Sequence, residues 1–481
     1  MTWEAVIGIE THIELRTRSK MFCGCPTEFG GEPNRNVCPV CLGLPGALPV
    51  PNEKAIEWTI ALGVALGCAI APHSVFHRKN YFYADLPKNY QISQYDLPLC
   101  VGGHLEVDAG AGVRRLGITR VHLEEDTGKS THLGGGGRIH DADATLLDFN
   151  RSGIPLVEVV SEPDIRTPDE ARAYAQELRG VVLALGISDA RLEEGSMRFD
   201  GNVSLRAAGG GPFGTKVEVK NMNSLRSLHR ALAHEIERQG KILDGGGAVA
   251  QETRHWDEEA GRTGAGRSKE ESSDYRYFTE PDLVPLAVDD ATVSRIRAAL
   301  PELPAARRAR YVAAGIEENA ARTLVAGGLA ELFDAAVLLG ATARTAANWL
   351  TGEVTAYLNR TGGDAAASLA LDAAGLAELA AMVDGGELSS TAAKDVLTGV
   401  LAGEGTPRTI AVARDLLQVS DESTITALVA AVLADHPGEV ARVAAGEDKL
   451  VGFLVGKVMR SGGGKADPKI VDRLVREQTS R

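Results

Sequence analysis

Carboxylate and imidazole side chains recur at alternate positions in the segment 6–15. In an extended strand, alternate side chains point to opposite faces. One face would carry Glu10, His12 and Glu14, and the other would carry isoleucines and Leu15. Three ionisable groups in a row require a cation or solvent, because burial of an unpaired charge is costly. The segment therefore fits either a metal-binding face or a face open to water.

The same alternation recurs in the segments 120–126, 197–206 and 215–221. Four such strands predict an antiparallel sheet with one apolar side and one polar side that serves as a reaction floor. Glu125 would lie on the opposite face or at the strand end. The polar residues of this predicted floor also include His122, Glu124, Asp126, Arg198, Asp200, Asn202, Ser204, Arg206, Lys216, Glu218 and Lys220.

These side chains suit magnesium and phosphate. Carboxylate oxygens are ligands that Mg²⁺ prefers, and Lys and Arg neutralise phosphate charge. Together they predict phosphoryl transfer from ATP. The segment 127–130 ends like a Walker A motif but lacks the upstream glycine, and no G-x-G-x-x-G lies in a strand-to-helix setting. ATP would therefore bind outside a P-loop or Rossmann frame.

Four cysteines form two close pairs, Cys23 with Cys25 and Cys38 with Cys41. Two such pairs can supply a tetrahedral four-sulfur zinc site, which would be closed and structural. Two disulfides or a redox pair are the alternatives, and a reducing compartment disfavours disulfides. Structural zinc is the favoured interpretation.

The segment 78–95 interleaves five aromatic residues with lysine, arginine and amides. Such a stretch suits stacking on a nucleic-acid base with phosphate contacts. It equally suits a loop whose tyrosine rings pack into the core. Composition leaves both interpretations open.

Bulk composition is that of an ordinary globular protein, with 44% hydrophobic and 24% charged residues. The net charge of −14 argues against indiscriminate nucleic-acid binding, although the segment 451–481 is locally basic. Charge alone favours a solvated helical face for that segment. No signal peptide is evident, and the apolar stretch 55–71 contains Glu57, so it predicts a buried helix rather than a membrane span. We expect a cytoplasmic protein with no membrane contact.

Elements of two kinds must position these residues. Strand-like runs and Gly-rich loops dominate residues 1–288, whereas residues 289–406 and 407–481 show the 3.6-residue periodicity of helices. A proline-spaced stretch near 280–286 and Thr406-Pro407 mark the two boundaries. The predicted fold class is α+β, with a catalytic first domain, an all-α second domain and a small all-α tail.

Motifs along almost the whole chain resemble those of the B subunits of the aspartyl/glutamyl-tRNA amidotransferases. The resemblance is carried by residues 8–12, 38–46, 78–94, 124–129, 150–164, 194–200, 220–224, 251–254, 267–278 and 457–466. So many long motifs in the same order are highly specific. The resemblance implies that the first domain is a cradle of antiparallel sheets with flanking helices, and that the tail contacts tRNA.

The resemblance also implies a reaction and partners. ATP would phosphorylate the side-chain carboxylate of Glu-tRNA(Gln) or Asp-tRNA(Asn), and ammonia would displace the phosphate to form the amide. A glutaminase A subunit would supply the ammonia, and a small C subunit would complete a heterotrimer. Structural zinc would supplement this fold.

Site residues are carried over from the family onto matching positions. Glu10, His12 and Glu125 resemble the primary magnesium set. Further magnesium or phosphate-side carboxylates implied by the resemblance are Asp200, Glu218, Glu124 and Glu252. Contacts to ATP or the acyl phosphate, and for Lys79 also a catalytic role, are assigned to Lys79, Lys88, Lys220 and Arg198.

Two other functions stay open from the sequence. One is an ATP-dependent ligase acting on a free small carboxylate without tRNA. The other is a zinc-stabilised tRNA-binding subunit that has no phosphoryl-transfer site of its own and whose acidic floor is structural.

Overall fold

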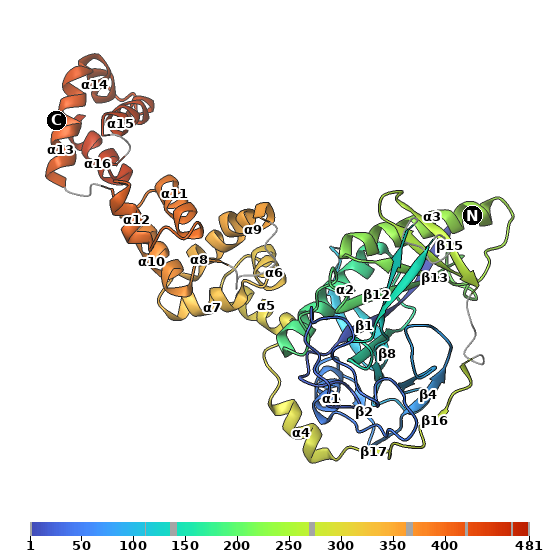
Figure 1. Ribbon diagram of the computed structural model, residues 1–481. Coiled ribbons are helices and arrows are strands. Elements are labelled where there is room, and N and C mark those ends of the chain that lie inside the picture. The colour runs from blue at the N-terminus through green and yellow to red at the C-terminus, as the bar shows by residue number, and fades with distance from the viewer. Residues whose placement is uncertain are drawn as a thin grey trace. The chain divides into compact units, whose positions relative to one another are not determined.

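The computed structural model describes residues 2–110, 112–134, 142–268, 275–361, 369–418, 422–462 and 465–479. The motifs at 267–278 and 457–466 therefore lie partly outside the described residues. Tertiary contacts divide the chain into one unit of residues 1–304 and a second of residues 305–481. Figure 1 shows both units and labels many of their helices and strands.

The first unit is built on a ten-stranded sheet in the order β15-β14-β13-β12-β1-β11-β8-β6-β2, with β7 also paired to β8. Its strands are β1 Trp3–Glu14, β2 Ala69–Ile70, β6 Cys100–Val101, β7 His104–Asp108, β8 Val113–Glu125, β11 Pro155–Ser161, β12 Met197–Ala207, β13 Val217–Met222, β14 Glu252–Asp257 and β15 Arg262–Ser268. The pairings are antiparallel except for that between β13 and β14, which is parallel. The sheet expected from the alternating segments is thus present.

The apolar face of this sheet packs on helices α1 Glu53–Ala65, α2 Pro168–Leu185 and α3 Leu225–Asp244. Ile7, Ile9 and Ile13 of β1 are almost fully buried in this core, as the period of two predicts. A side chain at Gly201 of β12 would come within 2.8 Å of Leu232 on α3. Glycine at this position therefore allows the helix to approach the sheet closely.

The flanking helices begin at side-chain caps. Thr167 accepts a hydrogen bond from the backbone N–H of Glu170 at the start of α2, and Pro168 occupies the first helical turn. Ser224 caps α3 in the same way. Such caps satisfy backbone donors that the first turn of a helix leaves free.

A smaller sheet of β16 Phe278–Thr279, β4 His77–Asn80 and β5 Tyr90–Ser93 packs on β8. Arg78 on β4 pairs with the buried Glu280, with Nε to Oε2 at 2.7 Å, which fixes the chain after β16 to this sheet. The aromatic segment lies here. Tyr95 stacks on Tyr277, with ring centres 4.3 Å apart, whereas Phe82 is 78% exposed.

Two further strand pairs complete the first unit. Strands β9 Lys129–Leu133 and β10 Ala144–Asp148 form one, and β3 His73–Ser74 with β17 Leu286–Ala287 forms the other. Helix α4 Asp290–Ala298 packs on α1, where Arg295 pairs with Glu57 at 2.9 Å. The contacts therefore place residues 289–304 in the first unit, although the sequence suggested a boundary at 288.

The described part of the second unit is helical. Its elements are α5 Pro304–Ala313, α6 Glu318–Ala326, α7 Ala330–Leu338, α8 Ala343–Trp349, the π-helix η3 Leu350–Val354, α9 Thr355–Thr361, α10 Ala373–Asp384, α11 Ser390–Leu401, α12 Pro407–Ala413, α13 Glu422–Asp435, α14 Pro437–Ala444, α15 Lys449–Ser461 and α16 Pro468–Thr479. One apolar cluster runs from Tyr311 to Ala411 and another from Ile425 to Val475. The α+β class with a helical C-terminal region is confirmed, and the division at 406 stays a prediction.

Across the described ranges, none of the helices combines the length and the hydropathy needed to cross a lipid bilayer.

Candidate active site

A row of ionisable side chains crosses three neighbouring strands on the polar face of the large sheet. His12 on β1 lies opposite Glu158 on β11, and Glu158 lies opposite His122 on β8. On its other side, His12 faces Arg198 on β12. The antiparallel register thus brings together residues from distant parts of the sequence.

His12, Glu124 and Glu158 form a compact group, in which one ligand atom from each residue lies within 4.8 Å of the others. The Nε2 atom of His122 lies 3.0 Å from Glu158 and 3.2 Å from Glu124. Ser93 and Gln91 on β5 donate hydrogen bonds to Glu124, at 2.8 and 3.1 Å. Two carboxylates and an imidazole at this spacing can hold a divalent cation.

The electrostatics of this group favour charged forms despite burial. Burial opposes protonation of His122, but Glu158 and Glu124 outweigh it and raise its pKa to about 9. Burial likewise opposes ionisation of Glu158, and His122 outweighs it, so the pKa of this carboxyl falls below its usual range. The group therefore keeps two carboxylates ionised in a largely buried position.

Lys79 on β4 faces the same group. Burial disfavours its charged form, yet Glu124, foremost among several anionic or polar neighbours, holds the pKa of Lys79 above its ordinary value. Its Nζ atom lies 4.9 Å from the ring centre of Tyr275 and 5.7 Å from that of Tyr81. The two rings and the carboxylates hold the ammonium of Lys79 beside the candidate metal site.

A second group lies on β1, β12 and β13. Lys220 contacts Asp200 at 2.9 Å and Glu218 at 3.6 Å. Asn202 donates to Glu10 at 3.0 Å, and the hydroxyl of Thr253 donates to Glu218 at 2.8 Å. Three carboxylates around one ammonium can bind a further cation or face a phosphate group.

Arg198 belongs to a third group at the end of β1 and β8. Its guanidinium lies 3.0 Å from Asp126 and 3.8 Å from Glu14, and Arg151 lies 3.7 Å from Asp126. Burial and the charge of Asp126 raise the pKa of Glu14 to about 9. Ionisation of Glu14 is therefore disfavoured, although Arg198 and Arg151 lie beside the two acids.

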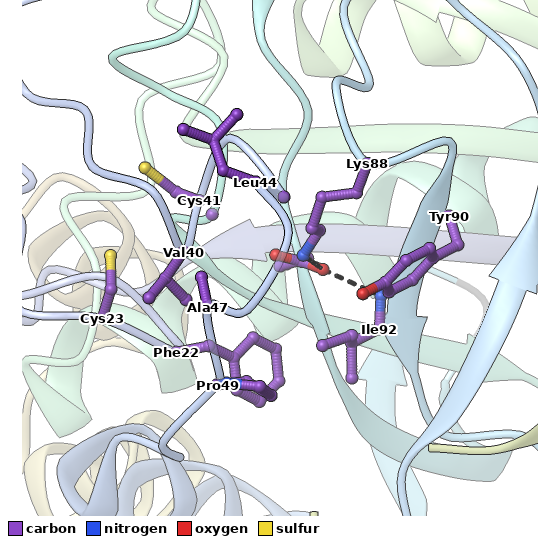
Figure 2. A pocket seen from close by; sticks show the side chains of 13 residues that line it. Phe22, Cys23, Val40, Cys41, Leu44, Ala47, Pro49, Lys88, Tyr90 and Ile92 are labelled. Atoms are coloured by element: carbon purple, nitrogen blue, oxygen red, sulfur yellow. Dashed lines mark hydrogen bonds and ion pairs between the residues drawn. The ribbon is translucent and has the colours of Figure 1, made fainter. Parts of the chain in front are cut away.

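Glu125 does not join His12 and Glu10. Its carboxylate pairs with Lys88 and accepts a hydrogen bond from the backbone of Ile92 at 2.9 Å. Both charged groups line a cavity of about 70 Å³ whose wall includes Phe22. Lys88 and Tyr90 lie along one side of it in Figure 2. Adjacent residues on a strand point to opposite faces, which separates Glu125 from Glu124.

Glu252 lies in a different environment from the other predicted carboxylates. Arg254 contacts it at 2.7 Å and Arg238 at 3.7 Å. These contacts satisfy the carboxylate within β14 and α3.

Glu158 is the functional candidate that sequence reasoning missed. It occupies the middle of the apolar segment 155–161, and its side chain is almost buried. A lone carboxylate in an otherwise apolar strand is itself a signal, because its burial requires a partner or a metal.

The four cysteines are positioned to hold a metal ion, as the sequence suggested. Their sulfur atoms all lie within 4.8 Å of one another, and Cys38 and Cys41 are 3.9 Å apart. Zinc bound to four thiolates at its usual bond length gives sulfur–sulfur distances of about 3.8 Å. All four are free cysteines. The cluster is compatible with structural zinc.

Two family models match this chain. The model described as the GatB/GatE catalytic domain matches residues 5–294, and the one described as the GatB domain matches residues 331–478. The chain therefore belongs to the class of proteins in which a GatB/GatE-type catalytic domain is followed by a helical GatB domain.

Relatives narrow this class. The B subunit of the aspartyl/glutamyl-tRNA(Asn/Gln) amidotransferase of Frankia casuarinae is 52% identical over 99% of this chain and 95% of that protein. Those of Salinispora arenicola and Thermosynechococcus vestitus are 50% and 48% identical over 99% of this chain, and over 96% and 97% of their own lengths. The chain belongs to the family of aspartyl/glutamyl-tRNA(Asn/Gln) amidotransferase B subunits.

Proposed function

We propose that this chain is the subunit that activates and amidates the side chain of glutamate on tRNA(Gln), of aspartate on tRNA(Asn), or of both. The observation that carries the proposal is the group formed by His12, Glu124 and Glu158 beside Lys79. The names of the relatives, in which the same tRNAs occur, support the choice of substrate.

The reaction has two balanced steps. A side-chain carboxylate oxygen attacks the γ-phosphorus of ATP, and ADP leaves with the electrons of the broken P–O bond. Ammonia then forms a C–N bond at the carbonyl carbon, the C–O bond to phosphate breaks, and a proton is lost from nitrogen. Phosphorylation is needed because a carboxylate is a poor acylating group at neutral pH.

Glu124 and Glu158 fit magnesium, because their carboxylates supply the oxygen ligands that Mg²⁺ prefers, and the imidazole of His12 would be a further ligand at the same spacing. Bound magnesium would offset charge on the transferred phosphoryl group. Glu10, Asp200 and Glu218 form the neighbouring acidic group and would serve a second cation or the phosphate side of the nucleotide. We assign Glu125 and Glu252 supporting roles, because Glu125 pairs with Lys88 beside the cavity and Glu252 pairs with Arg254 on β14, apart from the two acidic groups.

Basic residues on the same face would orient the substrates. Lys79 reaches the first acidic group, Lys220 the second and Arg198 the third. Each would contact phosphate oxygens of ATP or of the acyl phosphate, since ammonium and guanidinium groups bind phosphate by charge-assisted hydrogen bonds. Positioning of the esterified amino acid by its tRNA would then contribute much of the rate.

The second step requires a source of ammonia, and the complex would include further chains. A glutaminase A subunit would deliver ammonia, a small C subunit would complete the heterotrimer, and residues 407–481 would contact tRNA as a separate tail domain. The relatives are themselves B subunits of an amidotransferase, which supports a complex of several chains. Structural zinc would bind the four cysteines, and their free thiols suit a reducing compartment such as the cytoplasm.

The deciding experiment uses the chain assembled with the A and C subunits of its own source. ATP cleavage and amide formation are measured with each misacylated tRNA, with glutamine or with ammonium chloride as the nitrogen source. We expect His12→Ala to abolish tRNA-dependent ATP cleavage while tRNA binding persists. Retained cleavage in this variant would overturn the site assignment.

A second outcome separates the alternatives. Cleavage of ATP stimulated by free glutamate without tRNA would indicate a small-molecule ligase. Amidation that survives His12→Ala but is lost on deletion of residues 407–481 would indicate a tRNA-binding subunit with a structural acidic floor.

A further inference from the structure

Lys20 is a buried lysine that the proposed reaction does not use. Its side chain is only 1% exposed, and it is among the largest fully buried side chains described. Lysine is almost never buried to this degree unless its charge is paired. Its surroundings must therefore compensate a positive charge.

The contacts of the Lys20 ammonium are unusual. Its Nζ atom donates to the carbonyl oxygen of Phe149 at 3.2 Å and to the sulfur of Cys41 at 3.7 Å. Among the described residues, no carboxylate forms an ion pair with Lys20, whereas the buried ammonium of Lys88 pairs with Glu125. The carbonyl carries no net charge, so the sulfur of Cys41 is the contacted group that can balance a buried cation, as a thiolate.

A metal-bound cysteine cluster would supply the missing negative charge. Four thiolates around one Zn²⁺ carry a net charge of about −2. The thiolate of Cys41 is the one that Lys20 contacts, and Cys41 is buried together with it. The position of Lys20 therefore makes sense if the cluster is a tetrathiolate.

Backbone hydrogen bonds fix the lysine in this position. The N–H of Lys20 donates to the carbonyl of Cys25 at 3.0 Å, and the next N–H, of Met21, donates to Gly153 at 2.7 Å. Gly153 in turn donates to the carbonyl of Asp126 at 2.8 Å. Lys20 thus lies where the cysteine cluster meets the strand end that bears the third acidic group.

We propose that Lys20 is the charge partner of a zinc tetrathiolate. Its ammonium stabilises zinc binding because it offsets part of the negative charge of the four thiolates and donates an N–H···S hydrogen bond to Cys41. The inference rests on the proposed binding of zinc by the four cysteines. Lys20 would be a positioning residue outside the ligand set, and the role accounts for a buried lysine placed against the sulfur of Cys41.

The test compares zinc affinity in the assembled complex of the wild type and of Lys20→Met, by competition with a chromophoric chelator. Groups outside the ligand set commonly change metal affinity by about 10–100-fold. We expect a loss of this size for Lys20→Met, and a much smaller one for Lys20→Arg, which keeps the charge. The control is Lys54→Met, because Lys54 is an exposed lysine paired with Glu57 at 3.2 Å.

A double-variant comparison isolates the charge. Cys25→His replaces one thiolate by a neutral imidazole and lowers the negative charge of the cluster by one. Lys20→Met should then cost several-fold less zinc affinity in the Cys25→His background than in the wild type. Equal costs in the two backgrounds would overturn a charge role.

The possible outcomes distinguish the role of Lys20 from the proposed zinc site on which it depends. Wild-type complex without zinc would defeat the proposed zinc site itself. Zinc held by Lys20→Met within about threefold of the wild type would defeat only the role of Lys20. If Lys20→Met does not accumulate as folded protein, Lys20→Arg is the deciding variant. A zinc affinity within about threefold of the wild type supports the proposal, and a loss of about 10–100-fold overturns it.

Discussion

The Nε2 atom of His122 lies 3.0 Å from Oε2 of Glu158, and this contact joins β8 to β11 in the middle of the polar face. Glu158 in turn lies 3.9 Å from His12 on β1. One carboxylate therefore connects the imidazoles of two other strands. This arrangement makes Glu158 the centre of the candidate metal group.

Removal of the charge of Glu158 should stop phosphoryl transfer. We expect Glu158→Gln to lower tRNA-dependent ATP cleavage by about 100-fold or more, because electrostatic stabilisation of the transferred group is lost. Steady-state ADP release by the assembled complex measures this, with tRNA affinity followed in parallel. Glu162→Gln, at an exposed position just beyond the same strand, is the matched control and should stay near wild type. Unchanged ADP release in Glu158→Gln would remove Glu158 from the site.

The aromatic contact of Lys79 should position its ammonium. Tyr275→Leu should lower the rate of ATP cleavage several-fold with little change in tRNA affinity, because the ring that holds the cation is lost. Tyr275→Phe keeps the ring and should restore most of the rate. If instead the hydroxyl is the group that matters, Tyr275→Phe should be as damaging as Tyr275→Leu, which would contradict the role of the ring.

The Lys88–Glu125 pair should show the energetics of a buried ion pair, since the two side chains are only 6% and 3% exposed. Lys88→Met leaves the carboxylate without its cation and should lower the free energy of unfolding by about 3–5 kcal/mol. The double variant Lys88→Met/Glu125→Gln should be more stable than Lys88→Met. Urea unfolding of the first unit measures both changes, and a double variant less stable than Lys88→Met would contradict the assignment.

Removal of zinc should lower the stability of the first unit against unfolding. We expect Cys38→Ser to lose stoichiometric zinc and to unfold at a lower temperature, because metal binding stabilises the folded cluster. Cys68→Ser, at a buried cysteine outside the cluster, should keep its zinc whatever its stability. Elemental analysis together with thermal unfolding distinguishes the two variants. Full zinc content in Cys38→Ser would exclude a four-cysteine site.

Several features of the fold follow from local sequence. The period of two in the segment 6–15 places Ile7, Ile9 and Ile13 in the core and Glu10 and His12 on the polar side, as the structure has them. Such alternation needs no knowledge of neighbouring strands, because successive side chains of any strand point to opposite faces. The spacing of the four cysteines likewise indicated a cluster, since both pairs are short and local.

Which of these residues meet was decided by strand pairing. Glu124 and Glu125 are adjacent in sequence, yet the first lies beside His122 and the second beside Lys88. Alternation along β8 already sends the two carboxylates to opposite faces, whereas the register of β11 against β8 and β1 decides that Glu124 meets Glu158 and His12. Contacts of this kind depend on hydrogen bonds between distant segments, and no local pattern encodes them.

The sequence by itself therefore determined the kinds of chemistry available, the polar and apolar sides of each strand, and the membership of the family. Only the tertiary structure brought Glu158 between His12 and His122, separated Glu10 from Glu125, and buried Lys20 against Cys41. The physical reason is that side-chain direction is a property of one strand, whereas proximity is a property of how strands pair and pack.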